Sequence, residues 1–390
     1  MTSPKQTYSQ AMLSPSAAYG YIPGLNGLRA IAVLIVIAAH FGISNLIPGG
    51  FGVTVFFFIS GFLITRLLIA EKKAKGKIGL KQFYIRRLIR LYPALIAMVI
   101  PTTAYFMLMG YGGPTLTEFS AALGYFTNFF QVSVRSAGDP LPFMSWTHLW
   151  SLAVEEHFYL VFPLIVVACG VVTKSLRNTL IAIVCIVPLW RLYIASGGLN
   201  VSAPHYNYMM SDARFDSLAW GCLLTVLLDR ARDIKKFKAL IGWAPIVAAL
   251  GLLALSFLWR DEMFRQVARY SVQGIALFIL VLNLYFFRRL QFSFKILEWP
   301  PIAWIGTVSY GLYLWHYPVL DATRRLVDSE PVTLAIATVA SLAVTALSFY
   351  AVEQPFTALR KRFGAHIVKR EAASPQMPAT DKKRLSPAKA

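Results

Sequence analysis

The chain has 390 residues, of which 57% are hydrophobic and 14% are charged. A soluble domain carries about 25% charged residues, so this composition excludes an ordinary soluble enzyme and indicates an integral membrane protein. The formal net charge of +20 does not call for a nucleic-acid partner, because the basic residues cluster in short stretches between apolar runs, as they do in cytoplasmic loops.

The apolar runs predict an all-α fold, a polytopic helical bundle of about ten transmembrane helices surrounded by membrane lipid. They extend over residues 22–356, which we expect to form a single membrane domain. Residues 1–21 are polar and lack the apolar core of a signal peptide, which predicts a cytoplasmic tail. Residues 357–390 are basic and end in a stretch rich in Pro, Ala, Ser and Lys, which predicts a disordered cytoplasmic tail. The three cysteines have the spacing of neither a zinc site nor a disulfide framework, so we expect no metal site.

The first apolar segment, near residues 27–46, contains Arg29 and His40. An ionisable side chain at the centre of a membrane-spanning helix costs roughly 2.5–3.5 kcal/mol, so it usually faces a polar cavity or a partner. Eleven positions along a helix place His40 about 16 Å deeper than Arg29. We therefore expect Arg29 near one interface and His40 near the middle of the membrane, where an imidazole can exchange a proton close to neutral pH. The alternative is that Arg29 only orients the helix and His40 only bonds a neighbour.

A second span is expected near residues 51–69, and a basic loop follows it. The loop contains Lys72, Lys73, Lys75, Lys77, Lys81, Arg86, Arg87 and Arg90. The positive-inside rule places this loop, and with it the N-terminus, in the cytoplasm. A third span, near residues 91–109, leads to the other side.

The weaker stretch 119–132 contains Asn128 and Gln131. Counting it as a span would put the basic segment 229–238 outside the cell, so we expect a re-entrant or interfacial segment buried against protein. The remaining spans are then expected near residues 148–170, 176–195, 212–228, 240–259, 267–287, 301–320 and 332–352. Both termini become cytoplasmic, and residues 110–147 and 196–211 form the outer mouth.

Few polar residues lie inside these spans. Glu155 and Glu156 are adjacent in one helix and point about 100° apart, so at most one carboxylate faces the same cavity as His40. The alternative for this pair is an ion pair that locks the helix to an Arg or His elsewhere. His316 lies toward the outer end of its helix, where it either faces a pocket opened by Pro318 or belongs to an interfacial aromatic belt.

Two further groups suggest ligand binding. Asp216 lies one turn inside a helix that enters from the outer side, and its carboxylate suits sugar hydroxyls. Arg87 and Arg90 are three residues apart at the start of a helix, where two guanidiniums can hold a phosphate. The alternative for the arginines is an ordinary cytoplasmic cluster. Ser60 and Gly61 lie in the middle of the second span, where small residues let helix backbones approach closely.

Taken together, these motifs resemble the membrane-bound acyltransferase-3 family. The resemblance rests on PGLNGLRAIAVLIVIAAHF, GGFGVTVFFFISGFLIT, FYIRRLIRLYPAL, WSLAVEEHFYLVFP, RFDSLAWG, SYGLYLWHYPV and VEQPF, in that order. The residue after the acidic pair is usually Gln in the family and is His157 here, which predicts a different hydrogen-bond pattern around Glu155. Larger members carry an extracytoplasmic SGNH hydrolase-like domain after the membrane region, and we expect this chain to lack it.

The resemblance implies a membrane-bound O-acyltransferase of the bacterial cytoplasmic membrane. No tightly bound cofactor is expected; the donor is acetyl-CoA or another acyl-CoA on the cytoplasmic face, and Arg29, Arg87 and Arg90 bind it. His40 acts as general base or acyl carrier, with Glu155 orienting its imidazole. The acceptor, a hydroxyl of a carbohydrate that is extracytoplasmic or lipid-linked, enters past Asp216, His316 and Glu156. Polysaccharide-assembly proteins are further candidate partners.

A transporter would share several of these features. About ten helices, intramembrane His and Glu and a re-entrant segment equally describe a proton-coupled transporter or a flippase-like partner in polysaccharide assembly. The cytoplasmic arginine motif favours the enzyme, because a transporter has no need of a phosphate-binding clamp beside its basic loop.

Overall fold

The computed structural model describes residues 22–42, 48–230 and 234–360. The predicted tail 1–21 lies outside these residues, as does the part of the predicted C-terminal tail beyond residue 360. Throughout the described ranges the regular structure is helical and contains no strand, which confirms the all-α prediction.

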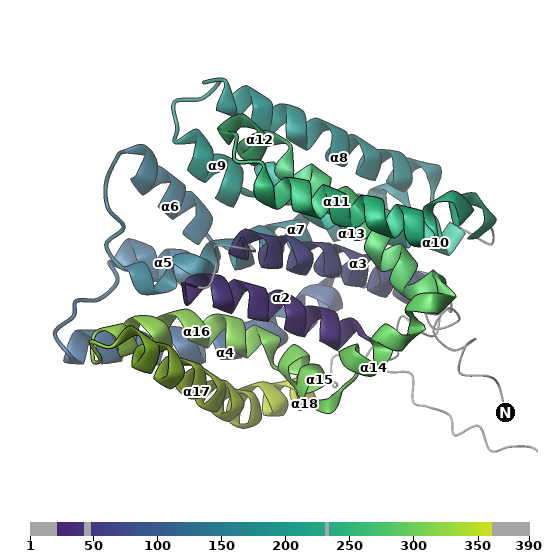
Figure 1. Cartoon of the computed structure of the whole chain (residues 1–390). Coiled ribbons are helices and arrows are strands. Elements are labelled where there is room, and N and C mark those ends of the chain that lie inside the picture. Colours follow the sequence, from purple (N-terminus) through teal and green to yellow (C-terminus); the bar gives the residue numbers. More distant parts are fainter. Residues whose placement is uncertain (1–21, 43–47, 231–233, 361–390) are drawn as a thin grey trace, which may run out of the picture.

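Each of the ten predicted spans overlaps helical structure (Figure 1), and residues 43–46 of the first span lie outside the described residues. The long helices are α2 (Leu25–His40), α3 (Gly49–Lys75), α4 (Leu80–Leu108), α7 (Trp150–Cys169), α8 (Lys174–Ala195), α10 (Ser211–Arg230), α11 (Trp243–Leu258), α13 (Arg269–Phe286), α16 (Ser309–Arg324) and α17 (Glu330–Ser348). The short helices are α5 (Leu116–Leu123), α6 (Thr127–Ser136), η2 (Met144–Leu149), α9 (Ala203–Met209), η3 (Ile234–Leu240), α12 (Glu262–Val267), η4 (Arg288–Phe292), α14 (Ser293–Leu297), α15 (Pro300–Thr307), η5 (Phe349–Glu353) and α18 (Gln354–Arg360).

Within the described part of the chain, six helices are long and apolar enough to cross a membrane, and α2 and α11 are shorter apolar helices. The other two predicted spans meet this standard less well. Helix α10 carries Asp212, Arg214 and Asp216 near its start, and the span predicted at 301–320 is divided into α15 and α16 at Val308. Both exceptions carry buried polar groups, among them Asp216 on α10 and His316 on α16.

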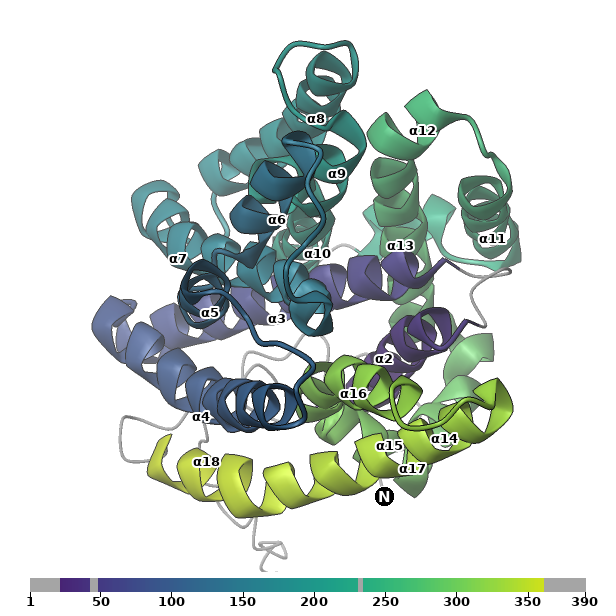
Figure 2. The same ribbon diagram turned by 90° about the vertical axis from the view of Figure 1, so that its left-hand side faces the viewer.

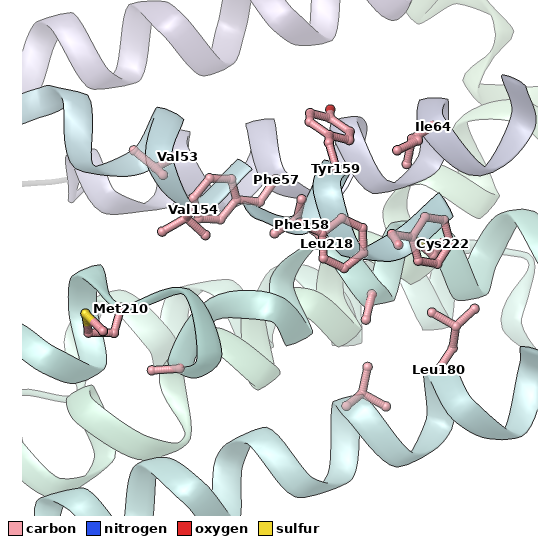
Figure 3. Packing of buried hydrophobic residues seen from close by; sticks show 14 of the residues in the cluster. Val53, Phe57, Ile64, Val154, Phe158, Tyr159, Leu180, Met210, Leu218 and Cys222 are labelled. Atoms are coloured by element: carbon pink, nitrogen blue, oxygen red, sulfur yellow. The ribbon is translucent and has the colours of Figure 1, made fainter. Parts of the chain in front are cut away.

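Helices α2 and α3 occupy the middle of the bundle (Figure 2). Helices α4, α16 and α17 lie on one side of them, and the groups α7–α10 and α11–α13 lie on the other. A large part of the core forms where α3 meets α7 and α10. Figure 3 shows the packed side chains Val53, Phe57, Ile64, Val154, Phe158, Leu218 and Cys222 at this junction.

Small residues allow α3 and α10 to cross closely. A Cβ atom added at Gly61 would overlap the carbonyl oxygen of Leu218, and one added at Gly221 would overlap that of Phe58. The expected role of Gly61 in close packing is therefore confirmed, and Gly221 is its counterpart on α10.

The segment predicted to be non-spanning forms two short helices, α5 and α6, joined at Tyr125, whose φ is 58°. Neither is long enough to cross a membrane. The polar side chains of α6 point into protein, since Asn128 Nδ2 donates to Ser211 Oγ (3.0 Å) and Gln131 Nε2 donates to the carbonyl oxygen of Thr147 (3.0 Å). Burial of this segment against protein is confirmed.

The short helices separate to the two ends of the bundle. Figure 1 shows α5, α6, α9 and α12 toward one end, and α14 and α15 toward the other. The segments predicted to form the outer mouth, 110–147 and 196–211, therefore share one end of the molecule. We call it the mouth end.

Candidate active site

Three histidines from distant parts of the sequence meet near the mouth end. His40 is the last residue of α2, His148 lies in η2, and His316 lies within α16. His40 Nδ1 is 2.8 Å from His316 Nε2, and the two rings are stacked with centroids 5.1 Å apart. His148 meets the His316 ring edge to face at 5.3 Å. The helix predicted near residues 27–46 ends earlier than expected, because α2 stops at His40.

The hydrogen bonds determine which nitrogens carry protons. His316 Nδ1 lies 2.7 Å from the carbonyl oxygen of Tyr313, and because a carbonyl only accepts, Nδ1 is the N–H donor. His316 Nε2 is then the acceptor, so His40 Nδ1 donates to it. His40 Nε2 consequently keeps a free lone pair, the form required of a general base.

Glu155 does not contact His40, and the predicted His40–Glu155 pair is wrong. Glu155 Oε1 accepts hydrogen bonds from Ser60 Oγ and Tyr159 OH, each at 2.6 Å. The physical reason is the position along the helix. His148 lies in the histidine cluster, and Glu155 lies seven residues after it, which is roughly 10 Å further along the helix and away from His40. The group that orients His40 is His316.

Arg87 and the acidic pair form an ion-pair cluster. Arg87 contacts both Glu156 oxygens, at 2.8 and 3.0 Å, and its Nη2 lies 3.5 Å from Glu155. Its guanidinium carbon lies 3.0 Å from the centroid of the Tyr159 ring. The alternative interpretation of the acidic pair, an ion pair that locks α7 to another helix, is what the structure shows. Glu156 therefore faces Arg87 rather than the mouth. Because Arg87 is paired with Glu156, Arg87 and Arg90 do not form the phosphate clamp that we expected.

Asp216 is also placed differently from the expectation. It is fully buried and receives two hydrogen bonds from Arg191, at 2.8 and 3.0 Å, and one from Ser271 Oγ at 3.0 Å. Its oxygens are thus satisfied by protein, so the prediction that Asp216 binds the acceptor is wrong. His157 likewise does not contact Glu155, since its Nδ1 lies 2.7 Å from Ser211 Oγ.

Three cavities follow one another through the bundle. The first, of about 520 Å³, is lined by Arg29, Arg90, Tyr310, Glu353 and neighbours. It shares Arg29, Arg90 and Tyr310 with a narrow cavity of about 110 Å³ that also contacts Arg87, Glu155 and Glu156. The narrow cavity shares Val53 and Tyr313 with a wide cavity of about 790 Å³ that contains His40 and His148. Together the lining residues of this series extend from the predicted donor arginines to the histidine cluster.

Two residues at this series were not predicted as site residues. His148 lines the wide cavity, and its Nε2 donates to the carbonyl oxygen of Leu314 (3.2 Å). Its buried Nδ1 has no hydrogen-bond partner among the described residues. Glu353 lies in the π-helical turn η5, a kind of turn common at functional sites, and its Oε1 is buried and unpartnered. Two sequence features could have identified these residues: His148 lies at the predicted mouth, and Glu353 is the carboxylate of the VEQPF motif. The described ranges hold no group of His, Cys, Asp or Glu side chains that could bind a metal ion.

Comparison with known proteins identifies relatives of this architecture. The chain matches a family described as an acyltransferase domain over residues 22–352. It is 31% identical to the peptidoglycan O-acetyltransferase OatA of Listeria monocytogenes, over 86% of this chain and 56% of the relative. It is 30% identical to YrhL of Bacillus subtilis, a candidate peptidoglycan O-acetyltransferase, over 90% of this chain and 58% of the relative. The chain thus spans less than two thirds of the length of these relatives. No solved structure matches it.

Proposed function

Because the chain belongs to the acyltransferase-3 family, we propose that it is a membrane O-acetyltransferase of the bacterial cytoplasmic membrane. It transfers an acetyl group from acetyl-CoA, bound from the cytoplasm, to a hydroxyl of an extracytoplasmic or lipid-linked carbohydrate of the cell envelope. The observation that carries the proposal is the series of adjoining cavities that leads from Arg29 and Arg90 to His40.

The donor occupies the first two cavities. Arg29 and Arg90 line the first cavity together with Glu353, and no acidic side chain of the described residues comes within ion-pair distance of either arginine. We place the phosphates of coenzyme A against these two guanidiniums. The narrow cavity of about 110 Å³ admits the thin pantetheine arm but not the nucleotide. Arg87, neutralised by Glu156, shapes the wall of this passage instead of binding phosphate.

The chemistry takes place at His40. Its Nε2 accepts the proton of the acceptor hydroxyl while the oxygen attacks the thioester carbonyl carbon. The C–O bond forms, the C–S bond breaks, and the imidazolium returns its proton to the departing thiolate, which leaves as coenzyme A. His316 holds the His40 ring in place. In the alternative mechanism His40 Nε2 itself attacks the thioester carbonyl carbon, so that a C–N bond forms while the C–S bond breaks and coenzyme A leaves; the acceptor hydroxyl then attacks the acetyl-imidazole, forming the C–O bond, breaking the C–N bond and losing its proton.

The experiment is transfer of labelled acetyl from acetyl-CoA to an envelope glycan fraction in membrane vesicles. We expect label with the wild type and with His157→Gln, a matched control because His157 bonds Ser211 outside the cavity series. We expect none with His40→Ala. Normal transfer by His40→Ala, in protein that elutes as a single folded species in detergent, would contradict the assignment. Absence of label with the wild type would instead favour the transporter interpretation.

A further inference from the structure

Arginine side chains line one wall of the wide cavity. Arg260 and Arg265 are exposed residues before and within α12, and Arg269 begins α13. All three line the same cavity as His40 and His148. We call these three residues the arginine wall.

The positive charge of the arginine wall is not neutralised by an ion pair within the described residues. No acidic side chain in the described ranges forms an ion pair with any of the three. Arg269 instead donates to the hydroxyl of Tyr270 at 3.0 Å. Glu262 is the one acidic residue that lines the cavity, and its carboxylate accepts a hydrogen bond from Gln266. Nearby Asp261 caps α12 by accepting from the backbone N–H of Phe264, and it does not line the cavity.

A fourth cation lies behind this lining. Arg214 is fully buried, and its guanidinium carbon is 3.8 Å from the centroid of the Tyr270 ring. Its hydrogen bonds go to the carbonyl oxygen of Tyr208 and to Thr54 Oγ, neither of which is charged. The cavity therefore contains more fixed positive than negative charge, in a concave site where the field acts more strongly than on an open surface.

The location of the arginine wall is not explained by membrane orientation. Helix α12 lies toward the mouth end of the bundle (Figure 1), which the predicted topology places outside the cytoplasm. Basic residues that orient a membrane protein gather on the cytoplasmic side, so these arginines go against that rule. Arginine, unlike lysine, presents a planar fork that pairs with carboxylate or phosphate through two hydrogen bonds.

The remaining lining of the cavity suits a sugar. Aromatic rings of Trp150, Tyr208, Trp259 and Tyr270 line it beside the arginines. Its volume of about 790 Å³ falls within the ~300–1,000 Å³ that small-molecule sites occupy. Flat apolar faces and a few fixed polar groups together favour a carbohydrate ligand over a hydrocarbon chain.

We propose that the arginine wall binds an anionic group, a carboxylate or phosphate, carried by the carbohydrate acceptor. The inference rests on the proposed function and names the acceptor's chemistry: the enzyme acetylates a hydroxyl of a sugar that bears, or adjoins, a negative charge. The same guanidiniums could instead meet phosphates of bilayer lipids, and the test separates these two sources.

The test measures binding without acetyl-CoA, on the full chain in phosphatidylcholine nanodiscs. The probes are an N-acetylmuramic-acid-containing tetrasaccharide and the same sugar with its carboxylates converted to amides. We expect the wild type to bind the acid roughly tenfold more tightly than the amide, and increasingly so at low salt. The double variant Arg260→Gln/Arg265→Gln should lose this preference and still bind the amide. The matched control is Arg324→Gln, which removes an exposed arginine near the mouth end that pairs with Glu330.

Equal binding of acid and amide by the wild type would overturn the proposal, as would a preference that persists in the double variant. A second arm adds phosphatidylglycerol to the nanodiscs. If the double substitution lowers only the enrichment of this lipid around the protein, the arginines contact the bilayer and the proposal is wrong. Absence of labelled acetyl transfer to both sugars by the wild type, alongside intact preference for the acid, would contradict the proposed function and leave standing only the anion site at the arginine wall.

Discussion

At the scale of single residues, the histidine pair determines what the candidate site can do. His316 is held by a backbone carbonyl and passes that orientation to His40 through one hydrogen bond of 2.8 Å. When both imidazoles are neutral, His40 Nε2 carries the free lone pair, and His40 lines the wide cavity. A carboxylate is not needed to select the tautomer.

His316 is accordingly expected to act as a positioning residue. His316→Ala should lower kcat by roughly 10²–10⁴-fold, the usual contribution of a well-placed general base, while KM for acetyl-CoA changes little. Steady-state kinetics of labelled transfer would separate the two parameters. A variant that mainly raised KM for the donor would show that His316 belongs to donor binding instead.

Asp216 is expected to matter for stability rather than for the acceptor. The Arg191–Asp216 pair is fully buried, and breaking a buried ion pair costs roughly 3–5 kcal/mol because it leaves one charge uncompensated. Asp216→Asn should therefore lower the midpoint of unfolding in detergent, and the fraction that remains folded should keep the wild-type KM for acceptor. An unchanged midpoint together with a raised acceptor KM would restore Asp216 to the binding site.

At the scale of helices, the core depends on the close crossing of α3 and α10, where Gly61 on α3 and Gly221 on α10 lie. Both positions lie against a carbonyl oxygen of the other helix, so any side chain forces the two helices apart. In lipid, helix association depends on such close contact because the hydrophobic effect does not drive it.

Gly221→Ala is expected to destabilise the protein by about 1–3 kcal/mol, the typical cost of overpacking. Gly251→Ala on α11 is the matched control, because an added Cβ meets nothing within 4 Å there. Thermal unfolding of the two variants in the same detergent makes the comparison. Equal midpoints would mean that the α3–α10 crossing relaxes without cost.

At the scale of the whole molecule, the narrow cavity lies between the donor arginines and the histidine cluster, and it adjoins the wide cavity at Val53 and Tyr313. Tyr313 is held there by hydrogen bonds to Ser151 Oγ (2.5 Å) and to the carbonyl oxygen of His148 (2.8 Å). The narrow cavity is therefore the point at which donor access can be blocked without touching the histidines.

Leu152→Trp places a large side chain in the narrow cavity, which Leu152 lines. We expect loss of acetyl transfer with unchanged sugar binding, because the pantetheine arm no longer reaches His40. Leu160→Trp on the same helix is the control, since Leu160 is 58% exposed on the outside of the bundle and does not line the cavity. Wild-type transfer by Leu152→Trp would contradict the proposed path of the donor.

The sequence by itself determined the class of the protein, its helices and the segment 119–132 that does not span. These features depend on local properties, namely the length of an apolar run, its polar interruptions and the basic residues that flank it. Gly61 was likewise recognisable, because a small residue in the middle of a span has few other uses.

Only the tertiary structure decided which polar groups meet. His40 and His316 are separated by 276 positions and Arg87 and Glu156 by 69. Whether such residues touch depends on the rotation and depth of each helix in the bundle, which no local pattern records. Glu155 and Asp216 have the residue types expected of a catalytic site, yet packing gave them protein partners, while the stacked ring of His316 was brought to His40.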